Sequence, residues 1–145
     1  MKKLILLFVA CVSLTSITSC SNDDDNSSAS LEGKWEFSKY GYSFAGQEFL
    51  FDYEHTSGCT KDYIVFTSNT TTNHTFSSNG SGGCIEEIDN ATYTRNGNVL
   101  TSNSDETIEI ISISDTTLKF RLLYEGENEE IPDGAAALIV LKRIN

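Results

Sequence analysis

The stretch Leu118-Lys119-Phe120-Arg121-Leu122-Leu123-Tyr124 alternates apolar and charged side chains with a period of two residues. Because successive side chains of a β-strand point to opposite faces, the apolar positions from Leu118 to Tyr124 fall on one face. Lys119 and Arg121 fall on the other. The pattern predicts a strand with one face in a core and one face in water.

Runs of the same kind recur through the rest of the chain. They cover residues 35–44, 49–53, 63–67, 72–76, 91–95, 107–113 and 136–142, with a shorter run at 99–101. Turn-forming residues separate them, and Asn96-Gly97-Asn98 is the clearest hairpin signal. No long segment has the 3.6-residue period of a helix. Eight or nine short strands separated by turns predict an all-β protein, an antiparallel barrel or sandwich.

The first of these runs changes parity in its middle. Trp35 and Phe37 share one parity, whereas Tyr40 and Tyr42 share the other. Either a β-bulge near Ser38 shifts the register of the strand, or both of its faces are covered.

The N-terminus has the features of an export signal. Lys2 and Lys3 precede an apolar run at 4–12, which is shorter than the roughly 20 residues of a membrane-spanning helix. Residues 17–20, Ile-Thr-Ser-Cys, resemble a lipobox, which implies that residues 1–19 are removed and that Cys20 carries the lipid. Acyl chains on Cys20 would then anchor the protein to a membrane.

A polar stretch at 20–30 follows the expected anchor and contains three adjacent aspartates, 23–25. Its composition predicts a flexible acidic tether. It also resembles the surface-export signal of Bacteroidota lipoproteins, which implies an outer-membrane protein that faces the medium. A plain spacer and a calcium site are the alternatives. The folded domain is expected at 31–145.

The chain is strongly acidic. Its formal net charge is −11, and loss of Lys2 and Lys3 with the signal would make it −13. Such a charge disfavours binding to nucleic acids and polyanions, and it favours a soluble monomer. The alternative is that the acidity attracts a cationic partner.

Two cysteines remain in the expected mature domain, Cys59 and Cys84. In an oxidising compartment such a pair predicts a disulfide. The alternatives are free thiols, or a zinc site completed by His55 and His74, although the spacing matches no zinc-finger pattern.

The sequence contains no motif for a catalytic nucleophile, phosphate-binding loop or dinucleotide. Both histidines are expected in solvated positions, and the acidic run at 125–130 is expected in a solvated loop. The prediction is a protein without enzymatic activity, cofactor or metal. Residues 115–117, Asp-Thr-Thr, resemble a Bacteroidota O-glycosylation motif, with a β-turn as the alternative.

Several short motifs line up in the order of a known family. They are Leu-Glu-Gly-Lys-Trp at 31–35, Asp-Tyr-Ile-Val-Phe at 62–66 after Cys59, Tyr93 with Asn-Val-Leu-Thr at 98–101, Ile-Ile-Ser-Ile-Ser-Asp-Thr-Thr-Leu-Lys-Phe at 110–120 and Val-Leu-Lys-Arg at 140–143. Together they resemble the lipocalin-like domains of Bacteroidota lipoproteins. This resemblance implies an up-and-down barrel of eight strands, with Trp35 plugging its closed end.

An eight-stranded barrel can hold one small ligand or be filled by its own side chains. The first hypothesis is a module that binds a small apolar or amphipathic molecule. Its inward-facing candidates are Phe37, Phe120, Leu122 and Tyr124, all of which core packing would also explain. The alternative is a surface interaction or accessory protein with a filled barrel. It would bind a protein or glycan through its loops, with Tyr40 and Tyr42 exposed.

Overall fold

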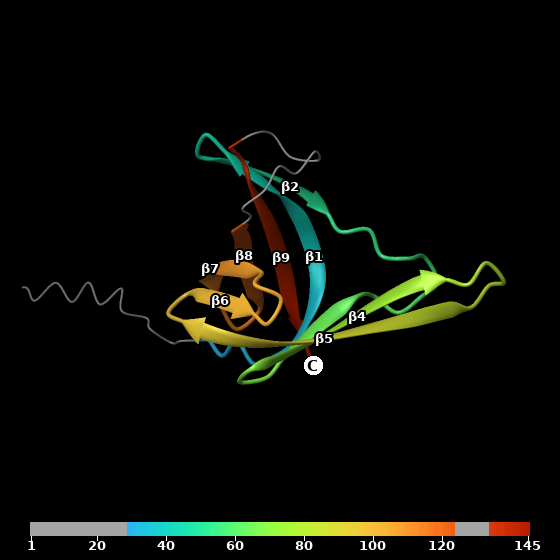
Figure 1. Ribbon diagram of the computed structural model, residues 1–145. Coiled ribbons are helices and arrows are strands. Elements are labelled where there is room, and N and C mark those ends of the chain that lie inside the picture. The colour runs from blue at the N-terminus through green and yellow to red at the C-terminus, as the bar shows by residue number, and fades with distance from the viewer. Residues whose placement is uncertain (1–28, 124–133) are drawn as a thin grey trace, which may run out of the picture.

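The computed structural model describes residues 29–123 and 134–145, and in these ranges every regular element is a β-strand (Figure 1). The nine strands are β1 Gly33–Phe44, β2 Gln47–Asp52, β3 Tyr63–Phe66, β4 Thr70–Ser78, β5 Cys84–Asn96, β6 Val99–Ser102, β7 Thr107–Ile113, β8 Thr117–Leu123 and β9 Ala136–Ile144. No helix in the described ranges is long and apolar enough to cross a bilayer. The predicted all-β class is confirmed.

The strands form one antiparallel sheet that closes on itself. Its order is β2-β1-β3-β4-β5-β6-β7-β8-β9, and β9 also pairs with β1. The closed barrel therefore contains eight strands, as the family resemblance implied. Strand β2 lies beside the second half of β1, where Lys39–Phe44 pair with it, whereas the first half of β1 pairs with β3.

One end of the barrel is filled. Trp35, Leu118 and Leu141 have no exposed surface there, and they belong to one hydrophobic cluster. The Trp35 Nε1 atom donates a hydrogen bond to the Leu31 carbonyl at 2.9 Å, and the Arg143 guanidinium lies 4.0 Å from the centre of the Trp35 ring. This filled end, which also holds the chain's C-terminus (Figure 1), is the closed end.

The change of parity in β1 is a β-bulge. Phe37 pairs with Leu141 of β9, whereas Lys39 pairs with Val140 and Tyr40 with Ile139, so Ser38 is the extra residue. Paired residues of antiparallel strands point to the same face. The bulge therefore returns the later aromatic residues of β1 to the face that carries Phe37, and the first of the two alternatives holds.

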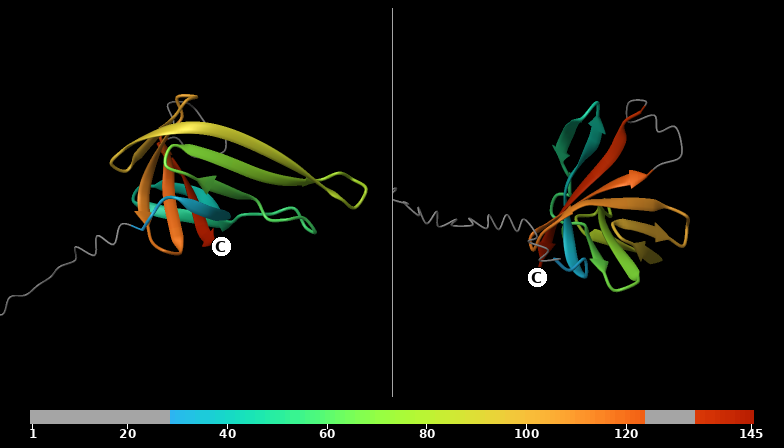
Figure 2. Two further views of the ribbon diagram at one scale, coloured as in Figure 1. Left: turned by 90° about the horizontal axis from the view of Figure 1, so that it is seen from below. Right: turned by 90° about the vertical axis from the view of Figure 1, so that its left-hand side faces the viewer.

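At the opposite, open end the strands spread apart. The β1–β2 and β4–β5 hairpins diverge from each other beyond the filled core (Figure 2). Strand β6 pairs with β5 only from Tyr93 onward, so in the described part of the chain the β5 edge from Cys84 to Ala91 has no ladder partner on that side. The predicted strand at 91–95 is thus much longer than expected.

A disulfide joins Cys59 to Cys84, with their Cα atoms 5.7 Å apart. It connects the β2–β3 segment to the start of β5. The predicted pairing is confirmed, and the zinc and free-thiol alternatives do not hold.

Candidate functional site

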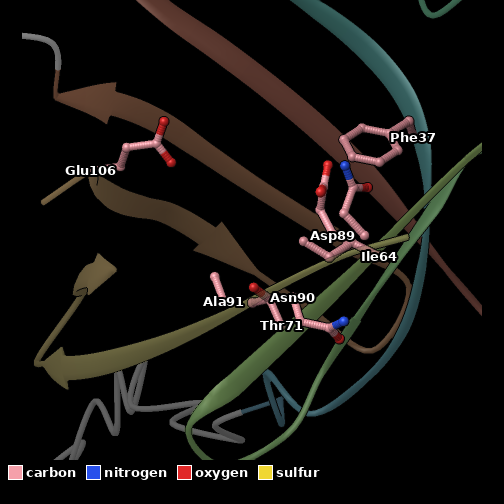
Figure 3. A pocket seen from close by; sticks show the side chains of 8 residues that line it. Phe37, Ile64, Thr71, Asp89, Asn90, Ala91 and Glu106 are labelled. Atoms are coloured by element: carbon pink, nitrogen blue, oxygen red, sulfur yellow. The ribbon is translucent and has the colours of Figure 1, made fainter. Parts of the chain in front are cut away.

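A hollow of about 390 Å³ opens at the open end of the barrel, above the filled core (Figure 3). It is lined by residues from five parts of the fold: Phe37 of β1, Ile64 of β3, Thr71 and Asn73 of β4, Asp89, Asn90 and Ala91 of β5, and Glu106 of the β6–β7 turn. In Figure 3, Phe37 and Asp89 lie on one side of this hollow and Glu106 on the other.

The apolar residues that line the hollow adjoin the hydrophobic core. Phe37 and Ile64 are half-buried and pack against the hydrophobic cluster. Ile64 pairs with Asn73, and Asn73 pairs with Asp89, so these three residues share the inner face of β3, β4 and β5. The inner face therefore changes from apolar at β3 to polar at β5.

The polar part contains an acceptor without a donor. The Asn73 Oδ1 atom is buried and has no hydrogen-bond partner among the described residues. A buried polar atom without a partner costs free energy unless another molecule supplies the missing bond. Asp89 and Glu106, by contrast, are exposed at the rim of the hollow.

Aromatic side chains of the β1–β2 hairpin continue the inner face beyond Phe37. Tyr40 pairs with Phe51 and Tyr42 with Phe49, with ring centres 5.9 and 5.1 Å apart. We call these four residues the aromatic ladder. Tyr40 and Phe51 are about half exposed, at 46% and 52%. Exposed aromatic rings next to a hollow are typical of ligand-binding surfaces rather than of a protein interior.

A hydrogen-bonded network holds Phe37 in position. The Asp62 N–H donates to His55 Nδ1 at 3.0 Å, so the ring proton lies on Nε2, which donates to the Phe37 carbonyl at 2.9 Å. The Phe37 N–H donates to the Asp62 carbonyl at 3.2 Å, and the Phe37 ring stacks on Tyr53. The expectation that His55 is solvated is wrong, because both of its ring nitrogens are bonded.

Asp62 is the buried charge at the centre of this network. Its carboxylate accepts from the Tyr53 hydroxyl at 2.9 Å and from the Phe76 N–H at 2.8 Å. Burial raises the pKa of Tyr53 to about 12, with smaller contributions from its hydrogen bond to Asp62 and from the Asp62 charge. The network therefore depends on a protonated Tyr53 and links β1, β4 and the β2–β3 segment.

The comparison with protein families bears on this fold directly. The model of the lipocalin-like domain matches residues 31–120, which is more than half of the chain. The chain belongs to the lipocalin-like domain family. No curated protein matches it. A lipocalin-like barrel suggests ligand binding in general, and among the described residues the hollow at the open end offers room for a small ligand.

The residues predicted for ligand binding in this lipocalin-like domain separate into three groups. Phe37 lines the hollow. Phe120 is buried in the hydrophobic cluster and Leu122 packs against it, so both support the core and neither is among the lining residues. Tyr124 lies outside the described residues, as does Cys20. Trp35 is fully buried at the closed end of the barrel.

Sequence reasoning missed the polar side of the hollow. Asn73, Asp89 and Glu106 were not singled out, because a polar side chain does not add to the apolar alternation that marks the inner face of a strand. A usable signal existed in the parity of β5. Asp89 and Ala91 share the parity of Tyr93, which is a core residue, and this predicts the same inner face.

Proposed function

We propose that this lipocalin-like protein is a lipid-anchored lipoprotein on the surface of a Bacteroidota cell, and that it binds a small apolar or amphipathic molecule at the open end of its barrel. The observation that carries the binding role is the hollow lined by Phe37 and Ile64. Its volume, about 390 Å³, lies within the range of small-molecule sites, roughly 300–1,000 Å³.

The contrast between the two ends supports a binding role for one of them. Trp35, Leu118 and Leu141 are fully buried at the closed end and form a floor below the hollow. Above this floor, Phe37 and Ile64 are half-buried and Asn73 has an unsatisfied acceptor. An amphipathic molecule would cover the apolar side chains and supply the missing donor. We propose no catalytic step for this site.

The position of the described N-terminal residues fits a tethered domain. Leu31 lies at the closed end, where its carbonyl accepts the hydrogen bond from Trp35. A lipid on Cys20 and the acidic tether at 20–30 would therefore join the barrel at its closed end. In this arrangement the open end can face away from the membrane.

The lipid anchor is tested with a Cys20→Ala variant. Wild-type protein should incorporate a labelled fatty acid, remain in the membrane fraction and be cleaved by protease added to intact cells. The variant should lose the label. An unlabelled wild-type protein, or one protected from protease until the cells are lysed, would contradict the anchor or the surface location respectively.

The binding role is tested by native mass spectrometry of wild-type protein released from its own membranes. We expect a bound mass of a few hundred daltons in addition to the lipid anchor, lost when the protein is unfolded and extracted with solvent. If extracts of the same cells never add a mass to stripped protein, the binding role is wrong.

A second function is favoured by the aromatic ladder. Exposed rings such as Tyr40 and Phe51 can stack on sugar rings or pack against a protein. In that case a Tyr40→Ala/Phe51→Ala variant should lose a retained protein or glycan partner, while a bulky residue placed inside the hollow should leave that partner bound.

A further inference from the structure

We propose that the hollow selects amphipathic molecules whose polar head is a cationic amine over those whose head is a carboxylate. This inference rests on the proposed binding function and adds the charge of the ligand. It follows from three observations: the charges around the hollow, the Asn73 Oδ1 acceptor that has no hydrogen-bond donor among the described residues, and the aromatic ladder beside the hollow.

The charged side chains that line the hollow are both acids. Asp89 lies on the inner face of β5, and Glu106 lies across the hollow in the β6–β7 turn (Figure 3). Neither carboxylate has a salt-bridge partner among the described residues. Glu87 adds a third acid on the same face of β5, two residues before Asp89. A carboxylate ligand would meet like charges here, whereas an amine would meet opposite ones.

The cations of the described ranges all lie elsewhere. Three belong to strand faces opposite the core and pair with acids there: Lys39 with Asp52, Lys119 with Glu48, and Arg121 with Glu109. Lys61 pairs with Glu36.

The other four cations are also absent from the residues that line the hollow. Arg143 covers Trp35 and Arg95 bonds the Gly97 carbonyl, both at the closed end. Lys34 lies over the Tyr63 ring, and Lys142 follows the core residue Leu141 with the opposite parity. Residues 124–133, outside the described ranges, contain no Lys or Arg in the sequence.

Two further features suit an ammonium group. The buried Asn73 Oδ1 atom is an acceptor without a donor, and an amine has N–H groups to donate. The faces of Tyr40 and Phe51 in the aromatic ladder are exposed on the inner face and can attract a cation through their π-electrons. A carboxylate offers neither interaction.

The test compares three probes with the same carbon skeleton: 3-phenylpropylamine, 3-phenylpropan-1-ol and 3-phenylpropanoate. Each is titrated by calorimetry at low ionic strength into the full, lipidated protein in lipid nanodiscs, with empty nanodiscs as the blank. We expect the amine to bind roughly tenfold more tightly than the carboxylate, with the alcohol between them, and added salt should reduce the difference.

Two variants with the same change of net charge separate the hollow from the general acidity of the protein. Asp89→Asn/Glu106→Gln removes the acids of the hollow, and we expect the amine and carboxylate affinities to approach within about twofold. Asp115→Asn/Glu32→Gln removes two exposed acids at the closed end and should keep the wild-type preference.

The outcomes distinguish the two proposals. If the carboxylate binds as tightly as the amine, or the preference survives in Asp89→Asn/Glu106→Gln, the charge selection is wrong and the binding function stands. If none of the three probes binds to the wild-type protein, both proposals are contradicted.

Discussion

Phe37 and Tyr40 lie three positions apart in β1, yet their side chains point to the same face of the sheet. Phe37 pairs with Leu141 and Tyr40 with Ile139, and the bulged Ser38 accounts for the odd spacing. In a regular strand, residues three apart point to opposite faces. The bulge therefore makes the aromatic ladder continuous with the hollow, and the geometry of the candidate site depends on it.

Deleting Ser38 should remove the bulge and leave the faces of β1 unchanged. Phe37 would be followed directly by Lys39 and Tyr40, which already pair with Val140 and Ile139, so Tyr40 would stay on the inner face. The deletion removes the hydrogen bond from the Tyr53 N–H to the Ser38 carbonyl, and we expect the free energy of unfolding, measured by urea denaturation, to fall by only about 1 kcal/mol. Ser38→Ala keeps the residue count and should change stability by less than about 0.5 kcal/mol. A deletion variant destabilised by about 3 kcal/mol or more would contradict the assignment of Ser38 as the extra residue.

Removing the disulfide should destabilise the fold without changing its topology. The bond between Cys59 and Cys84 closes a loop with a sequence separation of 25 residues. The chain-entropy model gives about 3–4 kcal/mol for a loop of this size. Urea denaturation of Cys59→Ala/Cys84→Ala should show this loss, and a reducing agent should destabilise the wild type but not the variant. Equal midpoints for oxidised and reduced wild type would contradict the prediction.

Stability should fall at high pH because Tyr53 must stay protonated. Its pKa is raised from 10.0 to about 12 in the folded state, so its contribution to stability is complete below about pH 10. That contribution is lost as the pH rises through 12. A titration of tyrosinate absorbance should show a tyrosine that ionises near pH 12 in the wild type and is missing in Tyr53→Phe.

Asp62→Asn is the companion variant for this titration. It removes the negative charge beside the Tyr53 hydroxyl and should lower the pKa of Tyr53, while burial keeps that pKa above its ordinary value. If the high-pH tyrosine is unchanged in Tyr53→Phe, the assignment to Tyr53 is wrong.

The sequence predicted most of the barrel because period-two alternation is a local property. The run from Leu118 to Tyr124 specifies both a strand and its inner face, and Leu118 and Phe120 are indeed core residues. The β5 strand was predicted too short, since Ile85–Asn90 places acids on both faces and gives no alternation. Its pairing with β4 stabilises it as a strand regardless.

The candidate site was predicted much less completely. Phe37 was identified because it is apolar and belongs to a strand. The hollow exists because the eight strands of the closed barrel diverge at its open end. Asn73, Asp89 and Glu106 come together there only because the sheet closes into a barrel. The bonded state of His55 likewise depends on contacts with Phe37 and Asp62, which are distant in the chain. Neither property can be read from a local pattern.

The central claim, that the hollow is the ligand site, is tested most directly by filling it. Ala91→Trp places a large side chain among the lining residues, whereas Thr94→Trp places the same side chain on the outward, exposed face of β5. With both variants folded as judged by circular dichroism, calorimetry with 3-phenylpropylamine should give wild-type affinity for Thr94→Trp and at least a roughly tenfold loss for Ala91→Trp. An Ala91→Trp protein that binds this probe as tightly as the wild type would contradict the account.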